Sequence, residues 1–255
     1  MRPGSAAARR LFKRRTAEPF HNALAQYPAV VGRIQSRGTP RLKTLRGDDA
    51  WVLEELPALL AVKGRLQSSE LQRLVRWKIT RGKFRPLMGM VAGNSKKSVL
   101  ASTAEACAAV GDDESCGDDE EMAALERLCE LRGVGPATAS VVLCALRPAT
   151  CAFMADETIE GVGLQRAYTA KTWAAMNERL GLKGEAIGMT AANVGRALWV
   201  QAMLSREGAL VESATRAASS ESKADESSDT VVEKAAVESE RSKRASKRRR
   251  KTYRI

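Results

Sequence analysis

Apolar residues recur at helical spacing along most of this chain, and no segment shows the strict alternation of a half-buried strand. Between residues 68 and 82, Leu71, Leu74, Val75 and Ile79 fall at positions i, i+3, i+4 and i+8, which is the pattern of a helix with one buried face. Similar patterns predict further helices over 17–27, 51–62, 94–110, 122–131, 136–146, 157–162, 171–180 and 190–204. The sequence therefore predicts an all-α fold.

Single residues predict where some of these helices begin and end. Pro28 stands just beyond the first helix, because proline cannot continue a helix. Asp49 is a candidate N-cap for the helix that starts near Trp51. Gly181 is a candidate C-cap for the helix over 171–180.

The composition changes near residue 207, where Ser, Ala and Glu begin to dominate. Such a segment buries too little apolar surface to offset the entropy lost on ordering. We therefore expect residues 211–255 to form a disordered, charged tail. The rest of the chain divides into a basic N-terminal arm over 1–15 and a helical domain over 16–210, whose length suits one large domain.

Positive charge is concentrated in three places. The chain has a net charge of +12, but residues 1–15 carry six basic residues and residues 241–255 carry nine, with no acid in either. The remaining 225 residues are therefore close to neutral, at about −3. Within them, the segment from Lys63 to Lys97 holds ten basic residues and one acid, Glu70. A basic segment on a near-neutral body suits a phosphate backbone, although a solvated helix face would have the same composition.

Several classes of protein are excluded by residues that the sequence lacks. No apolar run approaches the roughly 20 residues that span a bilayer, so we expect no membrane partner. The five cysteines have no C-x-x-C spacing, and without a secretory signal they are interpreted as reduced thiols. His21 is the only histidine, which excludes sites that need several imidazoles, and we expect no metal site.

The most informative segment, residues 131–162, reads LRGVGPATASVVLCALRPATCAFMADETIEGV. Gly133 and Gly135 permit positive φ and a close approach of the backbone to a ligand, and Pro136 fits the first position of a helix. The free N–H groups of that helix start form an anion site that suits a DNA phosphate. An ordinary hairpin of two tightly packed helices would explain the glycines equally well. The candidate phosphate-binding residues are Gly133, Val134, Gly135, Ala137 and Thr138.

The motif Leu-x-Gly-Val-Gly-Pro-x-Thr-Ala resembles the helix-hairpin-helix element of the HhH-GPD superfamily of DNA glycosylases, here over 122–146. The resemblance implies a two-lobed helical glycosylase fold and a catalytic aspartate about twenty residues after the hairpin. Asp156, which lies 21 positions after Gly135, is the counterpart. It also implies double-stranded DNA as the partner and base-excision repair, by hydrolysis of the N-glycosidic bond of a damaged or mismatched base, as the function.

A carboxylate at this position has a clear chemical use. Cleavage of an N-glycosidic bond builds positive charge on the sugar, and a carboxylate beneath the sugar stabilises that charge or orients a water molecule. The target nucleotide must leave the base stack first. Asp is also a favoured N-cap, so a role for Asp156 as a cap of the helix over 157–162 is the alternative.

The chain departs from the family pattern at informative positions. Members with lyase activity carry a Schiff-base lysine two residues after the second hairpin glycine, where this chain has Ala137. The resemblance therefore implies a monofunctional glycosylase without lyase activity, or a protein that has lost catalysis. No cysteine follows Cys151, so the iron–sulfur cluster of some members is excluded, while a monovalent cation at the hairpin is compatible with the motif. Met154 stands where the family has proline.

A second candidate region interleaves basic and aromatic residues, which is the composition for phosphate contact and base stacking. Its candidate DNA contacts are Lys78, Arg81, Lys83, Phe84 and Arg85, while Trp77 is expected in the core. The basic run at Lys247, Arg248, Arg249, Arg250 and Lys251 predicts nuclear localisation. We expect a monomer. The alternatives are a non-catalytic helix-hairpin-helix nucleic-acid-binding protein of the nucleus and an interaction scaffold.

Overall fold

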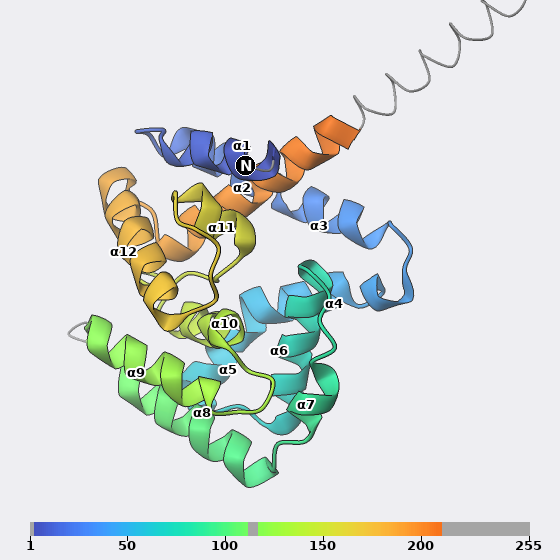
Figure 1. The fold of residues 1–255 in the computed structure, drawn as a ribbon, viewed down its shortest axis with the longest axis vertical. Coiled ribbons are helices and arrows are strands. Elements are labelled where there is room, and N and C mark those ends of the chain that lie inside the picture. The colour runs from blue at the N-terminus through green and yellow to red at the C-terminus, as the bar shows by residue number, and fades with distance from the viewer. Residues whose placement is uncertain (1–2, 112–116, 211–255) are drawn as a thin grey trace, which may run out of the picture. The chain divides into compact units, whose positions relative to one another are not determined.

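The computed structural model describes residues 3–111 and 117–210, and all the regular secondary structure within these ranges is helical, which confirms the all-α prediction (Figure 1). The chain divides into two units, Met1–Arg206 and Glu207–Ile255. Of the second unit only 207–210 are described, and they are helical. The predicted tail over 211–255 lies outside the described residues, and so does the basic run at 247–251.

Twelve α-helices of the first unit have defined bounds, and a further helix begins at residue 191. They are α1 (Pro3–Phe12), α2 (Glu18–Ala25), α3 (Tyr27–Gln35), α4 (Leu45–Ala50), α5 (Leu56–Lys63), α6 (Ser68–Arg81), α7 (Met88–Ala92), α8 (Lys96–Val110), α9 (Asp118–Cys129), α10 (Pro136–Leu146), α11 (Asp156–Gly161) and α12 (Ala170–Ile187). A short 3-10 helix, η1 (Pro40–Leu42), and a π-helical turn, η2 (Trp51–Glu55), precede and follow α4.

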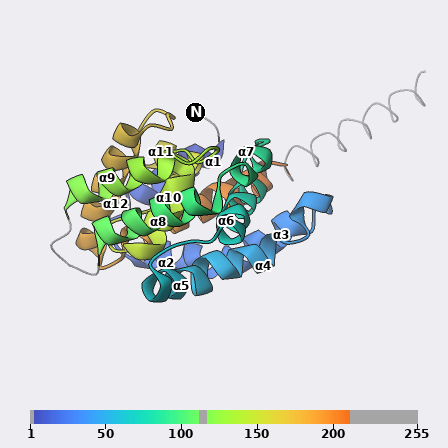
Figure 2. The same ribbon diagram turned by 90° about the horizontal axis from the view of Figure 1, so that it is seen from below.

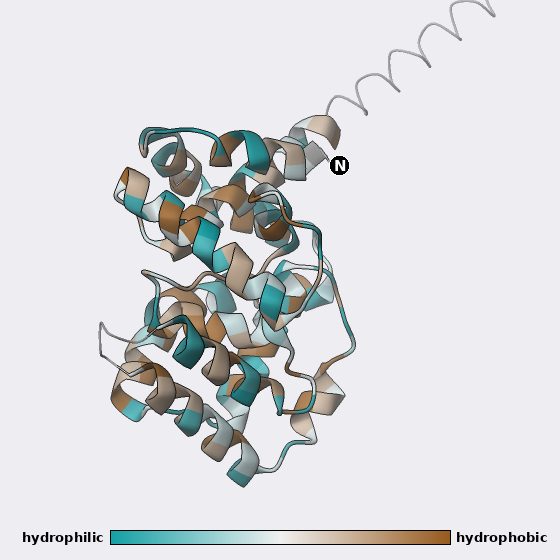
Figure 3. Cartoon of the chain, turned by 60° about the vertical axis from the view of Figure 1, so that its left-hand side comes forward, coloured by the Kyte–Doolittle hydropathy of each residue, from teal (hydrophilic) through white to brown (hydrophobic). Residues whose placement is uncertain are grey.

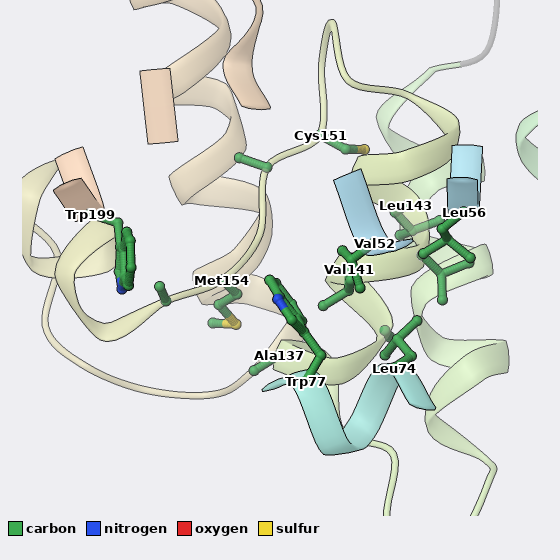
Figure 4. Packing of buried hydrophobic residues seen from close by; sticks show 14 of the residues in the cluster. Val52, Leu56, Leu74, Trp77, Ala137, Val141, Leu143, Cys151, Met154 and Trp199 are labelled. Atoms are coloured by element: carbon green, nitrogen blue, oxygen red, sulfur yellow. The ribbon is translucent and has the colours of Figure 1, made fainter. Parts of the chain in front are cut away.

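Helix α10 lies at the centre of the first unit. Seven consecutive residues, Ala137 to Leu143, are buried, so the helix is covered on every side. It packs against α5, α6, α9 and α12, which surround it in both ribbon views (Figure 2). Its apolar side chains meet Val52, Leu56 and Leu74 in the core (Figure 4). The helices carry both hydrophobic and hydrophilic residues along their length, as expected for helices with one buried face (Figure 3).

Part of the predicted basic N-terminal arm is helical. Residues 3–12 form helix α1, which packs against α11. The physical reason is a small apolar face: Ala8 and Leu11 are buried, whereas Arg9 and Arg10 on the opposite face are exposed. Two of the six basic residues over 1–15 are therefore presented from a helix.

Two of the predicted helix ends are wrong. Pro28 lies beyond the end of α2, as predicted, and it also stands in the first turn of α3, where Val30 and Ile34 give that stretch a buried face of its own. Asp49 is not a cap and lies buried near the end of α4. Helix α12 continues through Gly181 and ends instead at Gly188, whose φ of 69° is the left-handed conformation of a C-cap.

No helix within 3–111 or 117–210 is long and apolar enough to cross a membrane.

Candidate functional site

The hairpin between α9 and α10 depends on one glycine. Gly133 has a φ of +79°, and a Cβ atom there would lie 2.8 Å from Cγ2 of Val91 and 3.1 Å from Cβ of Met90. Gly135 differs from the prediction, because its φ of −122° is extended and no heavy atom lies within 4 Å of a Cβ built there. Gly133 is therefore required by the fold, whereas Gly135 leaves open space at the start of α10.

Asn94 holds the hairpin in place, a contact that the sequence pattern does not reveal. Its Nδ2 donates to the carbonyl oxygens of Arg132, at 2.9 Å, and Val91, at 3.0 Å, while its Oδ1 accepts from the backbone N–H of Arg132 at 2.9 Å. Sequence reasoning treats Asn94 only as part of the start of α8. The side-chain amide in fact ties the turn before Gly133 to the end of α7.

The side chains of the predicted phosphate-binding residues do not project into solvent. Val134, Ala137 and Thr138 are buried, and the Thr138 hydroxyl has no partner within the described ranges. The backbone N–H of Val134 donates to Leu131 O at 3.0 Å and that of Thr138 to Gly135 O at 2.7 Å, and Pro136 has no N–H. Within the described residues this leaves the N–H groups of Gly135 and Ala137 as the candidates for an anion at this helix start. Any phosphate contact at the hairpin therefore involves the backbone beside Gly135.

Asp156 is the first residue of α11, and its side chain does not cap that helix. The N-cap is Ala155, and no side-chain cap hydrogen bond is made. The Asp156 carboxylate instead accepts a hydrogen bond from the Tyr168 hydroxyl and lies 3.0 Å from a guanidinium nitrogen of Arg166. Its side chain is 19% exposed. The alternative in which Asp156 is only a cap is wrong.

The two partners fix both carboxylate oxygens of Asp156. Arg166 also pairs with Glu160, one turn further along α11. The pKa of Tyr168 is raised because its phenol is partly desolvated and its hydroxyl donates to the Asp156 carboxylate. Tyr168 is therefore a hydrogen-bond donor over the physiological pH range, and it holds Asp156 in one orientation.

A groove of about 590 Å³ brings most of the predicted site residues together. Asp156 and the hairpin residue Gly135 line its wall, together with basic residues of α6 and of the loop that follows α6. The predicted residues that line it are Lys78, Arg81, Lys83, Arg85, Gly135, Ala137 and Asp156. Phe84 is not among them; it is 53% exposed and stacks with the guanidinium of Arg41, whose Cζ lies 5.6 Å from the ring centroid.

Basic side chains predominate along this groove. Seven of its lining residues are basic, namely Arg37, Arg41, Lys78, Arg81, Lys83, Arg85 and Arg206, and two are acidic, Asp156 and Glu157. Glu157 is neutralised by Arg206, with a nitrogen–oxygen distance of 2.7 Å. The groove therefore carries a net positive charge around one negatively charged group, Asp156.

Lys78 is unusual among the basic residues of the groove. Its ammonium has no hydrogen-bond or ion-pair partner in the part of the chain that the structure describes. Burial lowers its pKa, as does the neighbouring positive charge of Arg85, and the charge of Asp156 opposes both effects. Lys78 thus lies within the electrostatic range of Asp156 without pairing with it.

An aromatic pocket of about 330 Å³ adjoins the groove and shares Arg81, Phe153 and Trp199 with it. Arg81 is only 9% exposed, and four rings surround its guanidinium. Its Cζ lies 3.8 Å from the ring centroid of Trp199, 5.1 Å from Trp77, 5.3 Å from Phe153 and 5.7 Å from Tyr27. Trp77 and Trp199 lie on either side of the segment that carries Met154 (Figure 4).

Asp49 supports this pocket from behind. It is buried, and its Oδ1 accepts hydrogen bonds from the Tyr27 hydroxyl at 2.7 Å and from Trp77 Nε1 at 2.8 Å. Burial raises the pKa of Tyr27, and the positive charge of Arg81 opposes this effect. The core prediction for Trp77 is confirmed, since it is 2% exposed, but its ring also forms a wall of the pocket.

Part of the basic segment over 63–97 is used within the fold. Asp48 accepts hydrogen bonds from Arg76, at 2.7 Å, and from Arg73, at 3.1 Å. Burial of Asp48 opposes its ionisation, but these bonds prevail and lower its pKa. These two arginines are therefore engaged with the protein and do not line the groove.

No group of three or more His, Cys, Asp or Glu side chains that could hold a metal ion occurs among the residues that the structure describes. The sequence matches no family model, no curated protein and no solved structure.

Proposed function

We propose that this protein binds double-stranded DNA and excises a damaged or mismatched base by hydrolysis of its N-glycosidic bond. One observation carries the proposal: Asp156 lines a basic groove together with Gly135 of the hairpin and basic residues such as Lys78 and Arg85. A DNA backbone needs the positive charge and the hairpin, and bond cleavage needs the carboxylate. These groups come from separate parts of the chain.

The chemistry assigned to Asp156 follows from its partners. Departure of the base leaves positive charge on the sugar, and the anionic carboxylate stabilises that charge or orients the attacking water. The Tyr168 hydroxyl and Arg166 hold the carboxylate in one orientation, so little reorganisation is needed when the charge develops. In this mechanism the hairpin backbone near Gly135 binds a phosphate and sets the register of the DNA.

The arrangement of helices supports the two-lobed glycosylase fold within this proposal. Helix α1 packs against α11 and α11 against α12, while α4, α6, α7 and α8 form a second set of packed neighbours. Helix α10 contacts members of both sets, α12 and α6. Asp156 begins α11 in one set, and Lys78 belongs to α6 in the other.

A non-catalytic nucleic-acid-binding protein is the second candidate, and one observation favours it. Both oxygens of the Asp156 carboxylate are already engaged, by Tyr168 and by Arg166. A carboxylate used only to hold the segment over 156–168 together would have the same contacts. This candidate predicts DNA binding without base excision.

A panel of duplexes, each with a single altered or mismatched base, tests the proposal. We expect the wild-type protein to release a base from at least one of them and to leave an intact abasic strand, which breaks only after added alkali. Binding to the whole panel without excision would support the non-catalytic candidate. Absence of both binding and excision would exclude both candidates.

Borohydride reduction during the same reaction tests the monofunctional assignment. No lysine follows the hairpin at Ala137, but the fold puts Lys78 on the wall of the groove. We expect no covalent adduct between protein and DNA. A trapped adduct that disappears in Lys78→Arg would contradict the monofunctional assignment, because it would identify Lys78 as a Schiff-base residue.

We also propose that the protein is located in the nucleus, because the basic run over 247–251 is typical of a nuclear-localisation signal. We further propose that it is a monomer. Deletion of residues 241–255 from a fluorescent fusion is expected to reduce nuclear accumulation. A fusion that stays confined to the nucleus after this deletion would contradict the assignment. The mass in solution, measured by light scattering, tests the monomer.

A further inference from the structure

The aromatic pocket contains a cation without a counterion. None of the guanidinium nitrogens of Arg81 has a hydrogen-bond or ion-pair partner within 3–111 or 117–210, and its Nε is fully buried. Buried donors without acceptors are rare in folded proteins, and a buried charge without a partner is costly. The four surrounding rings stabilise the charge through their faces, but they leave the N–H donors unsatisfied.

The rest of the lining adds a second cation. Arg196 lines the pocket near Tyr27, and Asn193 adds a side-chain amide, which can both donate and accept. No Asp or Glu lines the pocket. The nearest carboxylate that the structure connects to it, Asp49, points its oxygen at Tyr27 and Trp77 from behind the rings.

The size of the pocket suits a small ligand. The volume of about 330 Å³ lies in the lower part of the range for small-molecule sites. Trp77 and Phe153 line it with their rings packed against each other, at a centroid distance of 5.2 Å and an interplanar angle of 54°. Arg81, Phe153 and Trp199 line both the groove and the pocket, so the two adjoin each other at these side chains.

We propose that this pocket receives the extruded base and that Arg81 selects a neutral or anionic base with carbonyl acceptors over a cationic, alkylated base. The inference rests on the proposed function, since it assigns the substrate class of the same site. A base with exposed carbonyl oxygens satisfies the free N–H donors of Arg81. An alkylated base with a positive charge meets the charges of Arg81 and Arg196, while the aromatic faces that would otherwise attract it already surround Arg81.

The test compares binding to four duplexes that differ in one nucleotide with a fluorinated sugar, which prevents cleavage. The altered bases are uracil, hypoxanthine and 7-methylguanine, and the fourth duplex is undamaged. We expect the wild-type protein to bind at least one of the two neutral bases, uracil or hypoxanthine, about tenfold to a hundredfold more tightly than the cationic 7-methylguanine, the range that a good bidentate hydrogen-bonded pair provides. Equal binding to all four, or a preference for 7-methylguanine, would overturn the inference.

Two variants locate the preference. Arg81→Met should remove it, whereas Arg85→Met in the groove should weaken all four complexes by a similar factor and leave the preference in place. Arg81→Lys keeps the charge among the rings but loses the planar fork, so it should fold if Arg81→Met does not and should still lose the preference. A preference retained in Arg81→Lys and in any folded Arg81→Met would overturn the inference.

Excision from matching duplexes with ordinary sugars separates this inference from the proposed function. A preference that depends on Arg81 but leads to no excision would exclude hydrolysis and leave the base pocket intact. Excision without a preference for carbonyl-bearing bases would leave the proposed function intact and exclude the role of Arg81.

Discussion

The groove and the aromatic pocket share three residues, yet their charges are arranged in opposite ways. In the groove the acids are engaged: Asp156 is held by Tyr168 and Arg166, and Glu157 pairs with Arg206. In the pocket no acid is present on the wall, and the donors of Arg81 remain free. The first arrangement suits contact with a phosphate backbone, and the second suits a site that discriminates among ligands.

Within the proposed function, this difference separates affinity from selection. Exposed basic residues such as Lys83 and Arg85 would act on any DNA, because phosphates carry no sequence information. A buried guanidinium with unsatisfied donors would act only on a ligand that fills its pocket. Variants of the groove should therefore change all complexes equally, and variants of the pocket should change the order of preference.

The largest expected loss of stability comes from the support behind the pocket. Asp49→Ala leaves the Tyr27 hydroxyl and Trp77 Nε1, two buried donors, without an acceptor. Because an unsatisfied buried donor costs about 1–3 kcal/mol, we expect the free energy of unfolding to fall by about 2–6 kcal/mol in chemical denaturation. The matched control is Asp48→Ala, whose partners Arg73 and Arg76 are 35% and 43% exposed and can be solvated. An equal loss in the two variants would show that Asp49 has no special role behind the rings.

A slightly smaller loss is expected at the hairpin. Gly133→Ala introduces a side chain at positive φ, which costs about 1–2 kcal/mol, and a contact of 2.8 Å with Val91, which costs about 1–3 kcal/mol. Gly135→Ala has an extended backbone and open space, so its stability should change by less than about 1 kcal/mol. The new methyl group of Gly135→Ala should nonetheless weaken DNA binding, because Gly135 lines the groove. Similar stabilities of the two variants in denaturant would contradict this distinction.

The segment with the hairpin and Asp156 could be predicted from the sequence more fully than the aromatic pocket could. The hairpin and Asp156 lie within one stretch of about thirty residues, so spacing alone predicts α10 and its neighbour α11. The pocket takes Tyr27, Trp77, Phe153 and Trp199 from four distant segments, and nothing in local periodicity indicates that they meet. Arg81 was predicted only as a surface contact with DNA, since an arginine at a helix end normally faces solvent.

The assignments that failed have the same physical origin. The motif places a glycine at both 133 and 135, and the sequence permits a positive φ at either. Of the two, the fold requires that conformation only at Gly133, where α7 approaches the chain. Asp49 has the residue type of a cap, but tertiary hydrogen bonds from Tyr27 and Trp77 decide its position. In each case the residue type alone indicated a local role, and contacts with distant parts of the chain decided the actual one.

A smaller effect distinguishes the groove from the pocket in salt. Arg85→Gln should reduce the slope of log affinity against log salt by about 0.9, the value for one phosphate contact. Arg81→Gln should leave that slope unchanged, because a residue inside the pocket contacts no phosphate. Affinities measured at several salt concentrations on undamaged DNA give both slopes. A change of similar size in the two variants would show that Arg81 binds the backbone.

The smallest effect concerns Lys78. Its pKa is lowered in the folded state, so between that value and the unfolded value of about 10.4 the unfolded chain binds more protons and stability rises with pH. Lys78→Met should therefore stabilise the protein by less than about 1 kcal/mol at neutral pH, and the advantage should shrink as the pH rises through this window. Thermal unfolding of both proteins at several pH values measures the difference. An advantage that does not change with pH would contradict the lowered pKa.

The central claim, that Asp156 acts as the carboxylate of base excision, is tested most directly by single-turnover excision with Asp156→Asn. Asparagine keeps the size of the side chain and an acceptor for Tyr168 but removes the negative charge. Glu157→Gln, which alters the other acid of the groove, is the matched control. We predict that all three proteins fold and bind DNA, that Glu157→Gln retains excision, and that Asp156→Asn loses it by a factor on the order of 10²–10⁴. Excision by Asp156→Asn at the wild-type rate would contradict the claim.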